Sequence, residues 1–159
     1  MSDLRKTFWD IILEIAKEDK DVIVLVDDLG FSFCEKFQKE LPEQFINCGV
    51  IEQSMFGIAA GLALGGLKPY LYGTAPFLVF RPYEQIRDDI CYNALDVKII
   101  GTGASGFLGF SHNLNPSNED ELILKHLPNL EIYIPKSTES LEKVLLKSYQ
   151  HVKPTYIRL

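Results

Sequence analysis

The sequence predicts one α/β domain over residues 1–159, built on a mainly parallel sheet with helices on both faces. The run Val22-Ile23-Val24-Leu25-Val26 is short, β-branched and apolar throughout, as in strands that are buried on both faces. Similar runs alternate with segments of helical periodicity, which favours parallel strands joined by right-handed crossovers. The length of 159 residues suits a single hydrophobic core.

The predicted elements follow one another in regular alternation. Apolar residues recur at helical spacing through residues 3–19, which predicts the first helix. Ser32 and Glu35 have the spacing of a capping box for a short helix that ends near residue 41. The same patterns predict further strands at 45–48, 68–73, 97–101, 131–134 and 155–158, and further helices at 52–66, 83–94, 118–126 and 138–150.

The helix predicted over 52–66 has an unusual composition. Glu52 is its only charged residue, and the rest are small, apolar or uncharged. Each glycine inside a helix costs roughly 1 kcal/mol relative to alanine, so close packing must offset this cost. We therefore expect this helix to be buried against the sheet or against another subunit.

The carboxyl ends of the predicted strands are the expected ligand-binding edge, because ligands bind there in open α/β sheets. These ends fall at residues 27–28, 49–52, 73–77 and 101–112.

Composition argues against several functional classes. A net charge of −6 disfavours nucleic acid and anionic membranes as main partners, because both require a concentrated positive face. Cys34, Cys48 and Cys91 are too few and too scattered for a disulfide framework or a Cys-x-x-Cys metal pair. The N-terminus lacks the apolar run of a signal peptide, and no stretch reaches the roughly 20 apolar residues that span a bilayer. We expect a cytoplasmic protein.

One segment carries a resemblance to a known family. Glu52 follows a predicted strand and begins the glycine-rich helix, a position where any acid is favoured by the helix dipole. The surrounding string, however, is NCGVIEQSMFGIAAGLALGG, which closely resembles the "N-x-G-x-x-E-Q" segment and following helix of the transketolase family's pyrimidine-binding domain. The resemblance extends over nearly the whole chain.

The resemblance implies that the cofactor is thiamine diphosphate and that Glu52 activates it. In this family the glutamate hydrogen-bonds a ring nitrogen of the aminopyrimidine and drives the exocyclic amine toward its imino form, which deprotonates the thiazolium carbon. This role requires a carboxyl group that keeps its proton near neutral pH, as desolvation allows. Asp28 matches an aspartate near the cofactor in some members, although acids are also common in turns.

A second segment, residues 73–87, is similar to the family's aromatic wall that stacks on the aminopyrimidine. Offset stacking contributes about 0.5–1.5 kcal/mol beyond area burial, which suits a flat heterocycle. Phe77, Phe80 and Tyr83 are the candidates, and ordinary core packing is the alternative. Arg81 matches the variant of two-subunit transketolases and deoxyxylulose-phosphate synthases, which implies that it faces substrate.

A third segment, residues 103–113, resembles the family's glycine-rich loop that ends "D-G-P-T-H-Q". His112 takes the place of the histidine that reaches substrate oxygens, unless it is merely a surface loop residue. Leu108 stands where sugar-binding members carry an aspartate for a donor hydroxyl, which puts the usual ketose donor in doubt.

The diphosphate half of the cofactor has no ligands in this sequence. In the family, diphosphate and Mg²⁺ are bound by a Gly-Asp-Gly motif and a later Asn, and no Gly-Asp-Gly occurs here. The resemblance therefore implies a partner subunit that carries the Mg²⁺ ligands, in a hetero-oligomer built on a homodimer.

Three functions remain open at this point. The first is transfer of a two-carbon ketol unit from a ketone donor to an aldehyde. The second is 2-oxoacid decarboxylation with carboligation, as in deoxyxylulose-phosphate synthases or the β subunits of 2-oxoacid dehydrogenases, for which Leu108 leaves room. The third is a non-catalytic scaffold subunit, although Glu52, the aromatic wall and His112 together favour an enzyme.

Overall fold

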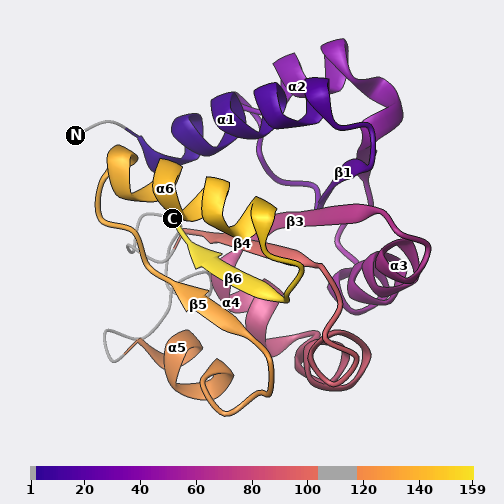
Figure 1. Ribbon diagram of the computed structural model, residues 1–159, viewed down its shortest axis with the longest axis vertical. Helices are drawn as coiled ribbons and strands as arrows, with labels where there is room; N and C mark the ends of the chain where they lie inside the picture. Colours follow the sequence, from indigo (N-terminus) through magenta and orange to yellow (C-terminus); the bar gives the residue numbers. More distant parts are fainter. Residues whose placement is uncertain (1–2, 104–117) are drawn as a thin grey trace.

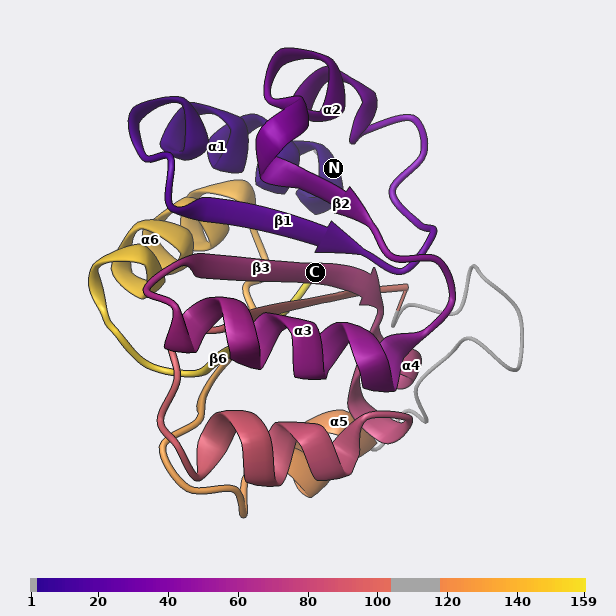
Figure 2. The same cartoon turned by 90° about the vertical axis from the view of Figure 1, so that its right-hand side faces the viewer.

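The structure, a computed structural model, describes residues 3–103 and 118–159, and within them six strands form one parallel sheet (Figures 1 and 2). The strand order is β2-β1-β3-β4-β6-β5, and every neighbouring pair is parallel. The strands are β1 (Val22–Val26), β2 (Phe45–Asn47), β3 (Lys68–Thr74), β4 (Lys98–Thr102), β5 (Glu131–Tyr133) and β6 (Thr155–Arg158). The predicted fold class is confirmed.

Helices cover both faces of the sheet. The helices are α1 (Leu4–Glu18), α2 (Glu35–Glu40), the 3-10 turn η1 (Pro42–Gln44), α3 (Glu52–Leu64), α4 (Ala75–Phe80), the π-helix η2 (Gln85–Cys91), α5 (Glu119–Leu124) and α6 (Thr138–Gln150). In Figures 1 and 2, α1, α2 and α6 lie on one side of the sheet, whereas α3, α4 and α5 lie on the other.

The sheet separates two hydrophobic cores, and β1 shows how the sequence fills both. Val22, Val24 and Val26 belong to the core beneath α1, α2 and α6. Ile23 and Leu25 belong to the core beneath α3, α4 and η2. Because side chains alternate between the faces of a strand, an unbroken apolar run is what a strand between two helical layers requires.

Two elements differ from the sequence-based expectation. Helix α4 was not predicted, because it is only six residues long, contains Pro76 in its first turn and shows no polar stripe. The segment 83–94 was predicted as an ordinary helix, but Gln85–Cys91 form a π-helix. In α2, the backbone N–H of Ser32 donates to Glu35, yet Cys34 occupies the N-cap position, so the full capping box does not form.

Helix α3 is buried on one face only. Met55, Phe56 and Ala59 are fully buried in the core against the sheet. On its outer face, Ile58 is 44% exposed and Leu64 is 72% exposed. The helix therefore packs against the sheet on one face, as its composition led us to expect, and its outer face is open to another subunit.

Candidate active site

Four of the predicted site residues, Asp28, Glu52, Phe77 and Arg81, lie near the carboxyl ends of β1, β2 and β3, which are neighbours in the sheet. Asp27 and Asp28 follow β1, and Glu52 begins α3 after the loop that follows β2. Helix α4, which carries Phe77, begins directly where β3 ends. Figure 2 shows the adjacent carboxyl ends of β1, β2 and β3.

Asn47 organises the turn that leads to Glu52. Its side-chain oxygen accepts a hydrogen bond of 3.0 Å from the backbone N–H of Gly49, and its side-chain nitrogen donates over 3.0 Å to Asp28 Oδ1. Gly49 has a φ of 72°, a left-handed conformation that glycine adopts without a steric penalty. The Asn-x-Gly part of the motif therefore builds the turn from which α3 starts, and it ties that turn to the end of β1.

Glu52, Arg81 and Phe77 are in direct contact. The side chain of Glu52 is only 5% exposed, and its Oε1 accepts a hydrogen bond of 2.5 Å from Arg81 Nη1. The guanidinium carbon of Arg81 lies 3.5 Å from the centroid of the Phe77 ring, a close cation–π contact. The structure thus holds a flat N–H donor between a buried carboxyl group and an aromatic face.

A second carboxyl group, that of Asp27, lies buried beside this cluster. It sits over Gly73, where an added Cβ would be only 2.2 Å from Asp27 Oδ2, so glycine is required to make room for it. Among the described residues, Asp27 Oδ1 has no hydrogen-bond partner. Burial and, after it, the negative charge of Glu52 raise the pKa of Asp27 to about 7, whereas backbone hydrogen bonds and the charge of Arg81 act in the opposite direction.

The other predicted residues lie at different places. The ring of Phe80 is 40% exposed at the end of α4. The hydroxyl of Tyr83 donates over 3.3 Å to the carbonyl of Ile123, and the side chain of Tyr83 packs against the core. Asp28 is exposed, with a φ of 60°, and pairs with Asn47. His112 and Leu108 lie outside the described residues.

Sequence reasoning did not identify Asp27 or the bridging role of Asn47. Asn47 was part of the recognised motif, so the signal was present. Asp27 carries no comparable signal, because its burial depends on Gly73, which lies 46 positions further along the chain on the neighbouring strand.

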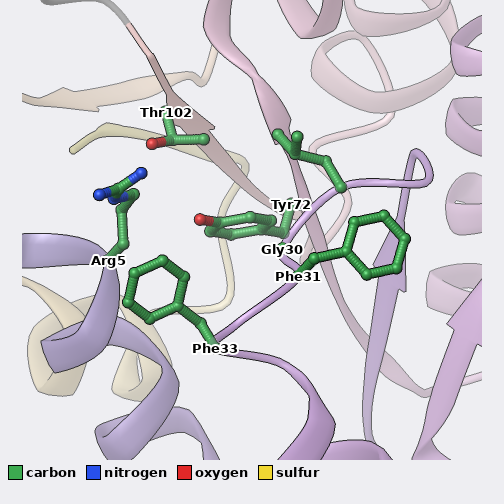
Figure 3. A pocket seen from close by; sticks show the side chains of 7 residues that line it. Arg5, Gly30, Phe31, Phe33, Tyr72 and Thr102 are labelled. Carbon is green, nitrogen blue, oxygen red and sulfur yellow. The ribbon is translucent and has the colours of Figure 1, made fainter. Parts of the chain in front are cut away.

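A separate pocket of about 100 Å³ lies at the same edge of the sheet, on the side of α1 (Figure 3). It is lined by Arg5, Leu29, Gly30, Phe31, Phe33, Tyr72 and Thr102. The guanidinium of Arg5 lies 4.9 Å from the centroid of Phe33. None of the residues predicted to bind cofactor or substrate lines this pocket, so it is distinct from the Glu52 cluster.

The described parts of the chain contain no group of three or more His, Cys, Asp or Glu side chains arranged to hold a metal ion. Within residues 3–103 and 118–159, no helix has the length and apolar character needed to cross a bilayer.

Comparison with known proteins identifies the family. The model of the family described as "Transketolase, pyrimidine binding domain" matches residues 1–159. An apulose-4-phosphate transketolase subunit of Phocaeicola vulgatus is 37% identical over an alignment of 159 residues that covers 98% of this chain and 50% of that protein. A 6-deoxy-6-sulfo-D-fructose transketolase subunit of Clostridium sp. strain MSTE9 is 31% identical over 157 residues, covering 98% of this chain and 49% of that protein.

Solved structures agree with this assignment. A split-gene transketolase, described as an inactive β4 tetramer, superposes with a TM-score of 0.86 at 34% identity over 98% of this chain and 50% of that one. A transketolase from Campylobacter jejuni has a TM-score of 0.85 over 97% of this chain and 25% of its own, but at 19% identity it supports the fold alone. This chain spans about half the length of the curated relatives it matches, and it belongs to the family of transketolase pyrimidine-binding domains.

Proposed function

We propose that this chain supplies the pyrimidine-binding part of the active site of a two-subunit transketolase-like enzyme. The enzyme transfers a two-carbon ketol unit from a ketone donor to an aldehyde. The observation that carries this proposal is the contact of the buried Glu52 carboxyl with a planar N–H donor that stacks on Phe77. Relatives named as transketolase subunits support ketol transfer over decarboxylation.

The residues at this site fit an aminopyrimidine. Glu52 offers a carboxyl group at the first turn of α3, and Phe77 offers a ring face. Thiamine diphosphate, when bound, supplies a thiazolium carbon that becomes a nucleophile after losing its proton. Glu52 would hold a proton against the pyrimidine ring nitrogen, Phe77 and Phe80 would orient the ring, and Asp28 would lie at the edge of the cofactor.

Substrate contacts are proposed for two further residues. His112 matches the family's histidine and would reach substrate oxygens, where an imidazole can donate a hydrogen bond or move a proton. Arg81, with a side chain that is 42% exposed beside Glu52, would face substrate from the mouth of the site. Tyr83, which is packed toward α5, would support the wall from behind.

The diphosphate and Mg²⁺ would be bound by a partner subunit, because the family binds them through a Gly-Asp-Gly motif that this sequence lacks. The outer face of α3 suits such an interface, since exposed apolar patches commonly mark interaction sites. A heteromer built on a homodimer would place the active site between subunits. Free thiols at Cys34, Cys48 and Cys91 fit a cytoplasmic enzyme.

Product analysis tests the proposed reaction. The chain assembled with its diphosphate-binding partner should convert a ketose phosphate and an aldehyde acceptor into a ketose longer by two carbons, without release of CO₂. Consumption of a 2-oxoacid with CO₂ release, and no ketol transfer, would contradict the proposal.

A charge on the outer face of α3 should break subunit association. Ile58 is 44% exposed at the centre of this face, and burying a carboxylate there would cost far more than burying the isoleucine contributes. We expect Ile58→Glu to weaken association at least about tenfold, since a single unpaired buried charge exceeds the 1.4 kcal/mol that a factor of ten represents. Light scattering over a dilution series measures this. Leu146→Glu is the matched control, because Leu146 is also 44% exposed but lies on α6. Equal association of both variants would exclude the α3 interface.

A further inference from the structure

Arg81 occupies the two groups that the proposed function assigns to the aminopyrimidine, the Glu52 carboxyl and the Phe77 ring face. Its Nη1 donates a hydrogen bond of 2.5 Å to Glu52 Oε1, and its guanidinium carbon lies 3.5 Å from the centroid of Phe77. The guanidinium is flat and packs on Phe77 as the pyrimidine ring would, but it donates to Glu52, whereas the pyrimidine ring nitrogen would accept a hydrogen bond from Glu52.

We propose that Arg81 is an internal competitor of the cofactor, whose guanidinium occupies the place of the aminopyrimidine in the free chain and must leave before the ring can bind. This inference rests on the proposed function of Glu52 and Phe77. The contact of 3.5 Å between the guanidinium and the ring centroid is van der Waals packing and leaves no space for a second planar group. The two occupants therefore exclude each other.

The difference in exposure between Glu52 and Arg81 makes Arg81 the side chain that moves. Glu52 is 5% exposed and is held at the start of α3, whereas the Arg81 side chain is 42% exposed. A partly exposed arginine regains water when it swings outward, and the pyrimidine ring nitrogen would then replace it as the partner of the buried Glu52 carboxyl. Its new position at the mouth of the site would also let it contact substrate. Arg81 would then pair with Glu52 in the free chain and face substrate once the cofactor is bound.

The departure of Arg81 also changes the charge balance around Asp27. The groups that act electrostatically on the Asp27 carboxyl are Glu52 and Arg81, and Cys48 lies close enough to respond to the charge of Asp27. Because the positive charge of Arg81 lowers the pKa of Asp27, its removal favours the protonated form of that carboxyl. Displacement of Arg81 would thus favour a neutral Asp27 carboxyl beside the neutral pyrimidine.

The test measures binding of the neutral hydroxymethyl-aminopyrimidine half of thiamine to the full chain, which needs neither diphosphate ligands nor metal. NMR shifts of the Phe77 ring protons report occupancy of the site. We expect Arg81→Ala to bind this fragment about tenfold more tightly than the unmodified chain, because partly exposed ion pairs and cation–π contacts are each modest. Arg81→Lys should fall between the two, since an ammonium keeps the charge but lacks the plane.

Arg87→Ala is the matched control, because Arg87 pairs with Glu84 and Asp88 on the same segment, away from Glu52. Its affinity should equal that of the unmodified chain, and thermal unfolding verifies that each variant is folded. Equal or weaker binding by Arg81→Ala, with Phe77 shifts present, would overturn the competition while leaving the proposed site intact. Absence of Phe77 shifts in every variant up to the solubility limit of the fragment would overturn the site and the competition together.

Discussion

Asp27→Asn should stabilise the protein by about 4 kcal/mol more at pH 8 than at pH 4, because a pKa difference of one unit corresponds to about 1.4 kcal/mol. The pKa of Asp27 rises from 3.8 to about 7 on folding, mainly through burial. Below the lower value both states carry the proton, so the carboxyl has no electrostatic cost. As the pH rises toward 7, the unfolded chain releases its proton first, and the native state is progressively destabilised.

Asparagine removes this pH-dependent cost, so the stability difference between variant and unmodified chain should grow through the window from about pH 4 to pH 7 and then level off. Urea unfolding midpoints across this range measure it. Asp28→Asn is the control for the change in net charge, because Asp28 is exposed and asparagine tolerates its left-handed φ of 60°. A stability difference for Asp27→Asn that stays constant with pH would mean that the carboxyl is not held in a raised-pKa environment.

The stability cost of Asp27 has a counterpart in function. A buried carboxyl without a partner on Oδ1 is expensive, and proteins concentrate such groups at functional sites. Asp27 lies next to Glu52 and Arg81, so the residue that lowers the stability of the native state lies at the proposed active site. A substitution that stabilises the protein at this position is expected, because residues at active sites are often unfavourable for stability.

The fold could be predicted from the sequence because the pattern of apolar residues shows where most helices and strands lie. The bounds of β1, α6 and β6 agree with the predicted segments, since each is a continuous apolar or amphipathic run. Helix α4 and the π-helix η2 could not be predicted in the same way. The first is too short to show a period, and the second packs against α3, a contact that local sequence does not reveal.

The candidate site was predictable only in part. The position of Glu52 at the start of α3 followed from its motif, and the structure places it there. The contact among Glu52, Phe77 and Arg81 joins residues up to 29 positions apart, so it arises from the parallel order of β1, β2 and β3 rather than from local sequence. The same holds for Asp27, whose space is created by a glycine on the adjacent strand.

Glu52→Gln should slow proton exchange at the thiazolium carbon by on the order of a hundredfold or more in the assembled complex, because general acid–base groups contribute this much. An amide cannot hold and release the proton at the pyrimidine ring nitrogen, whereas it retains nearly the same size and polarity. Cofactor affinity should therefore fall far less than the exchange rate.

His112→Ala provides the contrast for this measurement. If His112 contacts substrate oxygens, its loss should raise KM or lower turnover while leaving the exchange rate nearly intact. The two variants would then separate cofactor activation from substrate binding within one active site.

Quenched deuterium exchange at the thiazolium carbon, followed by NMR of the released cofactor, is the most direct test of the proposed role of Glu52. The chain assembled with its diphosphate-binding partner should exchange this proton rapidly, and the Glu52→Gln complex should exchange it at least about a hundredfold more slowly at equal cofactor occupancy. An unchanged exchange rate in the fully loaded Glu52→Gln complex would contradict the assignment of Glu52 as the activating residue.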